Sequence, residues 1–199
     1  MANTKKTCGL RPIDQPFGNV RVTHYKAVTG NELYRYMPVN LNASGYIEAA
    51  TLGSDNTLIG SIVGFMDGDW APVDEDYSGY VAANPSSVDS NGYINVLVAD
   101  DPYQLFVIEE DTGGSALTIA AIGAGVDMAF LATSGSTLSG VCNVVLDRST
   151  VGTNTGQQLA LVKLWDKDDN AYGNYAKWIV RIHNHRLNPP NQAGVSAVV

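Results

Sequence analysis

Short segments with β-strand character, separated by turn-forming residues, recur along most of the chain and restrict the folds open to it. In Asn19–Val28 (NVRVTHYKAV) side chains alternate between two faces, and β-branched and aromatic residues are frequent. Turn clusters such as Asn42–Gly45 and Ser90–Gly92 separate segments of this kind. Further strands are expected at Leu33–Val39, Tyr46–Ala50, Leu58–Phe65, Tyr80–Ala83, Tyr93–Ala99, Gln104–Glu109, Val141–Leu146, Leu159–Trp165 and Trp178–Arg186.

This spacing predicts an all-β fold, either an antiparallel β-barrel or a β-sandwich. The segment Ser115–Leu131 (SALTIAAIGAGVDMAFL) departs from the pattern, because its alanines favour a helix. Gly123 and Gly125 each disfavour a helix by about 1 kcal/mol relative to alanine. We therefore expect a short irregular or helical segment near residues 115–131.

Three parts are expected along the 199 residues. Residues 1–19 contain Pro12 and Pro16 and show little periodicity, which indicates an extended basic N-terminal arm. Residues 20–187 carry the predicted strands and form a single β-rich domain, and residues 188–199 form a C-terminal tail. A chain of this length can bury roughly 70% of its surface, so it needs no metal or disulfide for stability.

Signals for secretion, disulfide pairing and membrane insertion are weak. Cys8 and Cys142 lie far apart without a Cys-x-x-Cys spacing, so a disulfide has no support and a reducing cytoplasm is the expected compartment. The lysines near the N-terminus are not followed by the apolar core of a secretion signal. No apolar run of about 18 residues is present, and a membrane partner is not expected.

Charge is segregated along the chain. Lys and Arg are absent between Tyr36 and Asp147, yet this central span holds 15 of the 20 acidic residues. The six basic residues before it and the six after it leave three blocks with charges of +4, −15 and +3, within a net charge of −8. Two interpretations are open: an acidic surface that maintains solubility, or basic ends that dock onto acidic neighbours. Dispersed basic residues in a net-acidic chain do not favour nucleic-acid binding.

Two groups of acidic residues are candidate binding sites. Asp166–Asn170 (DKDDN) matches the first positions of a calcium loop, but Ala171 and Lys177 occupy the positions that require Gly and Glu. An acidic hairpin loop is therefore expected there. Asp67–Trp70 and Asp74–Asp76 combine acids with an aromatic residue, as sugar sites do. Nothing in the sequence sets their geometry, and solvated loops are the favoured interpretation.

The step Ile182–His185 (IHNH) places two histidines on one strand face, as a metal pair requires. We expect a polar or interface face instead, because neighbouring cations disfavour a metal. Catalytic residues, metal ligands and cofactor-binding residues are not predicted, since the sequence has no nucleophile elbow or phosphate loop. On this strand the polar face is expected to carry Lys177, Arg181, His183 and His185. The apolar face is expected to carry Trp178, Val180 and Ile182.

The stretch Val98–Asp111 (VADDPYQLFVIEED) places five carboxylates around an apolar run. By alternation, odd-numbered residues from Tyr103 to Glu109 point to one face and even-numbered residues from Gln104 to Glu110 to the other. Both faces are apolar, so the strand is expected to be covered on both sides, with the carboxylates as its solvated ends. Acids at opposite ends lie more than about 20 Å apart, too far to cooperate as a glycosidase pair.

Four motifs resemble a pattern found in tailed-bacteriophage structural proteins. They are VADDPYQLFVIEED, IGAGVDM, LDRSTVGTNTGQQLALVKLW and DNAYGNYAKWIVRIHNHRL, and they lie within about residues 93–187, roughly half of the chain. The resemblance is to small head decoration, or capsid-stabilising "cement", proteins. It implies a β-rich protein without catalytic residues, bound in many copies to the outside of an icosahedral head, often as a trimer.

The first hypothesis is therefore a virion structural protein, made in the host cytoplasm, that binds the major capsid protein and copies of itself on the capsid exterior. A protein that binds only the assembled shell stabilises it by mass action. The alternative is a carbohydrate-binding or adhesin module on a phage tail or host-facing surface, motivated by Trp70, Tyr77 and Tyr80. An acid-pair hydrolase is a third, weaker hypothesis. The candidate contacts with the shell or with neighbouring subunits are Lys5, Lys6, Arg11, Arg181, His183, His185 and Arg186.

Overall fold

The structure is a computed structural model that describes residues 3–13, 18–28, 30, 32–53, 55–67, 80–81, 89–152 and 156–187. Within these residues the chain forms β-strands and one short 3₁₀ segment, which confirms the predicted all-β fold class. The elements are β1 (Arg11–Ile13), β2 (Thr23–Val28), β3 (Leu33–Tyr34), β4 (Pro38–Leu41), β5 (Ile47–Ala49), β6 (Gly60–Met66), β7 (Tyr80–Val81), β8 (Tyr93–Ala99), β9 (Leu105–Glu109), η1 (Ile119–Ala121), β10 (Gly125–Gly135), β11 (Cys142–Gly152), β12 (Leu159–Leu164) and β13 (Lys177–Ile182).

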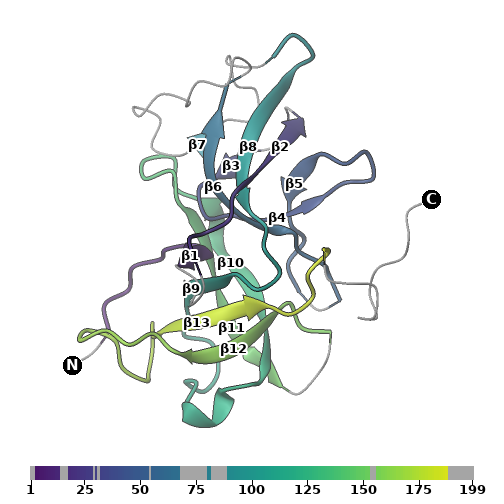
Figure 1. Cartoon of the computed structure of the whole chain (residues 1–199). Coiled ribbons are helices and arrows are strands. Elements are labelled where there is room, and N and C mark those ends of the chain that lie inside the picture. Colours follow the sequence, from purple (N-terminus) through teal and green to yellow (C-terminus); the bar gives the residue numbers. More distant parts are fainter. Residues whose placement is uncertain are drawn as a thin grey trace.

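The strands form two main layers (Figure 1). Five of them close into a barrel in the order β2-β5-β4-β6-β8, and β3 and β7 make a separate two-stranded pair. The other six form an antiparallel sheet in the order β1-β9-β13-β12-β10-β11. This sheet is curled, since a bridge between Glu110 and Leu146 brings β11 back beside the end of β9. The curled sheet lies below the barrel in Figure 1.

One continuous apolar core joins the two layers. The curled sheet contributes Phe106, Ile108 and Trp178, and the barrel contributes Ile62 and Val96, all of them fully or almost fully buried. The alternation read from the sequence explains this arrangement, because every second side chain of β9 and β13 points into the curl. Burial of apolar surface of this kind supplies most of the free energy that favours folding.

The segment near 115–131 is more ordered than the sequence predicted. A 3₁₀ turn occupies Ile119–Ala121, and strand β10 already begins at Gly125. Pairing of β10 with both β11 and β12 outweighs the helix preference of the alanines. Gly125 at the start of this strand allows the close approach of Gln157, whose side-chain oxygen lies where a Cβ would stand.

Part of the N-terminal segment belongs to the curled sheet. Arg11–Ile13 forms β1, an edge strand that pairs antiparallel with β9. Leu10, just before it, is fully buried. Pro12 is tolerated because β1 has a neighbour on one side only within the described sheet, and proline is compatible with such an edge.

The close approach of β6 to β8 yields a prediction for Gly60. A Cβ at Gly60 would overlap the backbone carbonyl of Ala99, which cannot move without disturbing β8. Gly60→Ala is expected to lower the free energy of unfolding by about 1–3 kcal/mol. The matched control is Gly64→Ala in the same strand, where the new methyl would lie 3.4 Å from the flexible side chain of Leu97. Urea titration should give a lower midpoint for the first variant alone; equal midpoints would contradict this packing.

Candidate functional site

Three of the five acids around β9 are buried and partnered, so the expectation of solvated strand ends is wrong for them, whereas Asp101 and Asp111 remain partly exposed. Asp100, Glu109 and Glu110 expose almost no surface. The predicted alternation is confirmed, because Glu110 points into the curl toward Trp178 while Glu109 faces the opposite side beside Lys177. Donors from other strands, which the sequence does not place, make this burial of carboxylates tolerable.

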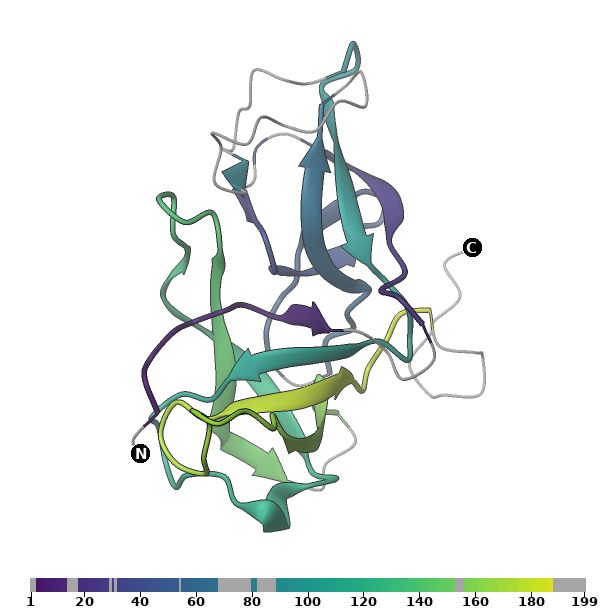
Figure 2. The same cartoon turned by 60° about the vertical axis from the view of Figure 1, so that its left-hand side comes forward.

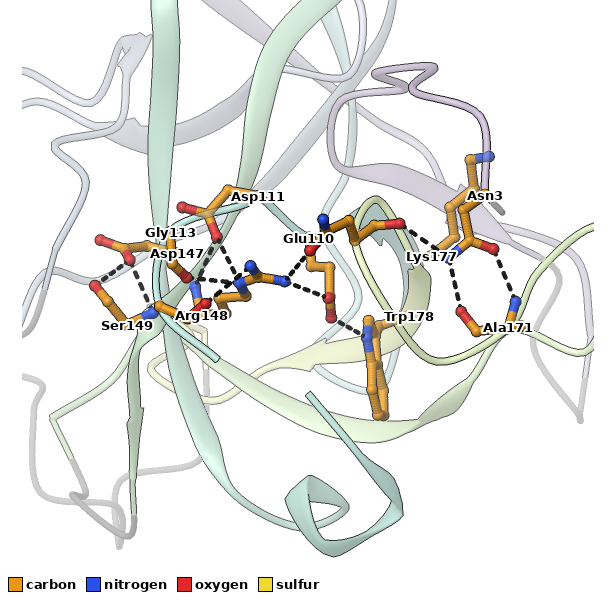
Figure 3. A network of polar contacts seen from close by, with 12 residues as sticks. Asn3, Glu110, Asp111, Gly113, Asp147, Arg148, Ser149, Ala171, Lys177 and Trp178 are labelled. Carbon is orange, nitrogen blue, oxygen red and sulfur yellow. Dashed lines mark hydrogen bonds and ion pairs between the residues drawn. The ribbon is translucent and has the colours of Figure 1, made fainter. Parts of the chain in front are cut away.

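Arg148 of β11 is the centre of a buried polar network (Figure 3). Its side chain is 4% exposed, and its Nη1 lies 3.1 Å from Oε1 of Glu110, which is 0% exposed. Arg148 also donates to the carbonyl oxygens of Gly113 and Gly114, at 2.6 and 2.9 Å, and to Oδ1 of Asn174 at 3.0 Å. One guanidinium thus ties β11 to the loop after β9 and to the loop before β13.

Glu110 is satisfied on both carboxylate oxygens. Trp178 donates from its indole Nε1 to the second oxygen at 2.8 Å, on the side away from Arg148. Burial raises the pKa of Glu110, while the hydrogen bonds from Trp178 and Arg148 act in the opposite direction. Because these groups are engaged by one another, we assign the network a structural role.

A second buried carboxylate, Asp100 at the end of β8, is bound by residues of β2 and by Arg21, which lies just before that strand. Thr23 and Tyr25 donate to its two oxygens at 2.9 and 2.7 Å, and Arg21 lies within 3.3 Å. Burial and the hydrogen bond to Asp100 raise the pKa of the Tyr25 phenol, which therefore stays protonated and remains a donor. This cluster closes the barrel between β8 and β2.

These contacts explain part of the charge segregation. In the described residues, each ion pair joins a cation from an end block to an acid of the central span. Opposite charges that are separated along the sequence therefore meet within the same chain. The pairs are Arg21–Asp100, Lys26–Asp89, Arg148–Glu110 and Arg148–Asp111.

Other cations gather on the outer side of the curled sheet. On β13, Lys177 and Arg181 pair with Glu109 and Leu105 of β9, and Lys163 of β12 pairs with Ile179 of β13. Directly paired residues of antiparallel strands point to the same face. This face is opposite to the one that carries Trp178 into the core. We call it the basic face and define it as Lys5, Lys6, Arg11, Lys163, Lys177 and Arg181.

The N-terminal segment completes the basic face. Arg11 of β1 pairs with Val107, which shares its face with Glu109. The backbone N–H of Lys6 donates to Oε2 of Glu109 at 2.7 Å, which places Lys5 and Lys6 beside Lys177. Burial raises the pKa of Glu109, and the Lys6 N–H together with the charges of Lys177 and Lys5 oppose that shift.

The basic face carries more positive than negative charge. Glu109 is the carboxylate that lies within it, and this group is buried beneath the cations. Within the part of the chain that the structure describes, none of the six cations is within ion-pair distance of a carboxylate. A surface that concentrates like charges on an otherwise acidic protein favours an acidic binding partner.

Of the predicted contact residues, the structure brings Lys5, Lys6, Arg11 and Arg181 together. His183 is exposed two residues beyond Arg181. The sequence did not single out Lys163, because the irregularity in register between Leu161 and Lys163 that turns it to this face is set by pairing with β13.

His185 and Arg186 do not belong to the basic face, and the assignment of His185 to the polar face of β13 is wrong. The strand ends at Ile182, after which the chain turns toward the barrel. His185 is 3% exposed, and its Nδ1 accepts a hydrogen bond from the Leu187 N–H at 3.0 Å. Arg186 donates to the carbonyl of Leu41 in β4 at 2.8 Å, so it joins the two layers.

The remaining candidate sites show no ligand geometry. The expected hairpin loop at Asp166–Asn170 is confirmed, with Asn170 bonding the backbone of Trp165 and Lys177 across its base. No group of three or more His, Cys, Asp or Glu side chains suited to a metal occurs among the described residues. Trp70 and Tyr77, with Asp69 and Asp74–Asp76, lie outside those residues.

No family model matches this chain, and searches of curated proteins and of solved structures find no match. The described part of the chain contains no helix with the length and hydropathy needed to cross a membrane. Cys8 and Cys142 are free thiols.

The Arg148 network predicts a large loss of stability when its cation is removed. Arg148→Met leaves the Glu110 carboxylate buried without its counter-charge, and we expect a loss of about 3–5 kcal/mol in the free energy of unfolding, measured by urea titration. Adding Glu110→Gln should recover part of this loss, since it removes the unpaired charge. Lys26→Met, which breaks the exposed Lys26–Asp89 pair, is the control and should change the midpoint little.

Burial of His185 predicts a pH-dependent stability. Desolvation lowers the pKa of its imidazole below the ordinary value of 6.5, and the charges of Asp100 and Asp101 counteract this in part. As the pH falls, the unfolded chain binds a proton at this imidazole at a higher pH than the folded chain does. The stability gained by burying the neutral imidazole is therefore complete above pH 6.5 and is lost as the pH falls below that value.

The measurement is a comparison of urea midpoints at about pH 7.5 and about pH 5. His185→Asn keeps an acceptor for the Leu187 N–H but does not titrate, so its midpoint should fall less than that of the wild-type protein. His183→Asn, at an exposed position, should behave like wild type. Identical pH dependence in all three proteins would contradict the assignment.

Proposed function

We propose that this chain is a virion structural protein, a capsid decoration or cement protein that binds the outside of a phage head and stabilises the lattice of the major capsid protein. The observation that supports this best is the basic face: cations from both ends of an acidic chain gather on one side of a rigid sheet. The motifs that resemble head decoration proteins include β9, β12 and β13, which build this face.

The basic face suits a protein lattice better than a nucleic acid. A chain with a net charge of −8 is repelled by a polyanion at long range, whereas carboxylates on a protein surface act at contact distance. The cations come from three strands of one sheet and from the segment before β1, and the sheet residues Val107, Glu109 and Ile179 between them are buried, which limits changes in the relative positions of the strands. A fixed pattern of charge favours one complementary surface over many.

Attachment in many copies explains how such a protein stabilises a shell. A component that binds the assembled lattice and not free subunits shifts the equilibrium toward assembly by mass action. Association of the copies as a trimer, as the resemblance implies, would strengthen attachment, because each contact raises the effective concentration of the next.

The structure changes how the role of the N-terminal arm is best tested. Residues 3–13 include an edge strand and the buried Leu10, so a deletion would disturb the curled sheet as well as any contact with the shell. Point substitutions on the exposed cations separate these effects.

Neutralising the basic face should weaken binding to the head. The triple variant Lys163→Gln/Lys177→Gln/Arg181→Gln is expected to bind about tenfold more weakly to heads that lack this protein, since exposed charge contacts contribute up to about 1 kcal/mol each. Its binding should also depend less steeply on salt concentration. Co-sedimentation with purified heads at several salt concentrations measures both effects.

Lys26→Gln is the control, because Lys26 pairs with Asp89 on the barrel and lies outside the basic face. Unchanged binding of the triple variant would contradict the proposed surface, and an absence of head binding by the wild-type protein would contradict the function. Binding to DNA that competes with heads would assign the face to a nucleic acid. Glycan binding lost on Trp70→Ala would support the adhesin hypothesis instead.

A further inference from the structure

A polar pocket of about 650 Å³ lies where the hairpin of β10 and β11 meets β3. Figures 1 and 2 show this hairpin rising from the curled sheet to lie beside β3. Two backbone hydrogen bonds join these segments, from the Arg35 N–H to the carbonyl of Gly140 and from the Cys142 N–H to the carbonyl of Arg35. The volume is within the range of roughly 300–1,000 Å³ that is usual for sites of small ligands.

Gly135 brings the two walls of the pocket together. A Cβ at this position would lie 2.3 Å from atoms of the Tyr34 ring, so the glycine lets the hairpin backbone pack against that ring. Tyr34 is 3% exposed, and its hydroxyl donates to Oε2 of Glu32 at 2.9 Å. Tyr34 therefore fixes the position of a carboxylate in the pocket and presents no open ring face to a ligand.

Hydrogen-bonding groups dominate the lining of the pocket. Four of the six hairpin residues 133–138 carry a hydroxyl. Asn143 adds an amide, whose Nδ2 donates to the Thr133 hydroxyl at 3.1 Å, and Glu32 adds its carboxylate. Among the described residues that line the pocket, none is a cation. Leu138, which is 92% exposed, is the apolar side chain of the lining.

The hairpin side of the pocket is held in shape by its own turn. The Ser136 N–H donates to the carbonyl of Val141 at 3.0 Å, and the Gly140 N–H donates to the carbonyl of Ser136 at 2.7 Å. The hydroxyl of Ser136 also accepts from the Ser139 N–H at 3.3 Å. A site formed before the ligand arrives loses less entropy on binding, so a few polar contacts are enough for measurable affinity.

The composition of the lining selects between classes of ligand. An anion would be repelled by Glu32, because no cation of the described lining compensates that charge. An apolar ligand would remove water from the hydroxyl and amide groups without replacing their hydrogen bonds, which is unfavourable. A polyhydroxylated ligand fits both constraints, since each of its hydroxyls can donate to a carboxylate or amide oxygen and accept from an amide or hydroxyl.

We propose that this pocket binds a neutral carbohydrate, and that Glu32 and Asn143 contact the sugar hydroxyls. The inference goes beyond the proposed function, because none of the lining residues belongs to the basic face. It also differs from the adhesin hypothesis, which places a sugar at Trp70. Attachment to a shell through the basic face and binding of a sugar in the pocket thus use different residues.

The test is a glycan array with neutral and acidic oligosaccharides, probed with the full chain. We expect saturable binding to neutral glycans, and calorimetry with the neutral oligosaccharide that binds best gives the Kd. Glu32→Gln keeps an acceptor for the Tyr34 hydroxyl but removes the charge, and Asn143→Ala removes the amide. Each variant is expected to weaken binding about five- to tenfold, as the loss of one hydrogen bond does.

Glu48→Ala is the matched control, because it removes a carboxylate of β5 that does not line the pocket, and it should bind as wild type does. Urea midpoints identify a variant that does not fold, in which case the other pocket variant carries the same expectation. Each pocket variant should still bind heads as wild type does, so this test is separate from that of the proposed function.

Three results would overturn the inference. One is the absence of saturable binding to neutral glycans, or binding confined to acidic glycans. Another is a neutral glycan whose affinity both pocket variants retain, since the sugar would then lie elsewhere, and loss on Trp70→Ala would place it at the adhesin site. The third is binding of putrescine in place of any glycan, lost in Glu32→Gln, which would assign the pocket to a cationic amine.

Discussion

The buried ion pair between Arg148 and Glu110 holds the curled sheet together. β9 and β11 lie far apart in the strand order of that sheet, and the guanidinium of one strand reaches the carboxylate that follows the other. Burying two charges is costly unless their remaining hydrogen-bonding groups are satisfied. Here two loop carbonyls, Asn174 and the indole of Trp178 provide those partners, so the network also fixes the loops beside the sheet.

Charge is sorted in the same way across the molecule. Cations that can reach the buried acids pair with them, as Arg21 does with Asp100 and Arg148 with Glu110. Six other cations lie on the outer face of the curled sheet, which contains β1 from the N-terminal end and β12 and β13 from the C-terminal end. A chain with a strong net negative charge thereby acquires one basic face, which is the physical basis of the proposed attachment.

The two layers have different surfaces although they share one core. The curled sheet combines the basic face with an uncharged protruding end at η1, whereas the ion pairs of Arg21 and Lys26 belong to the barrel. A continuous core makes the two layers a single rigid support, and rigidity reduces the entropy lost on binding. Such a support suits a protein that must bridge fixed positions on an ordered lattice.

The sequence by itself determined the fold class, most strand positions and the two-sided burial of β9, because these follow from alternation, turn residues and β-branched composition. Strand β10 could not be predicted, since pairing with β11 and β12 overrides the preference of Ala-rich residues for helix. The tertiary structure alone decided which charges are buried. Glu110 and Asp100 resemble solvated strand ends until Arg148, Trp178 and Tyr25 are brought to them from distant positions. The basic face has the same origin, because strand order and register, which depend on long-range pairing, place Arg11, Lys163 and Arg181 together.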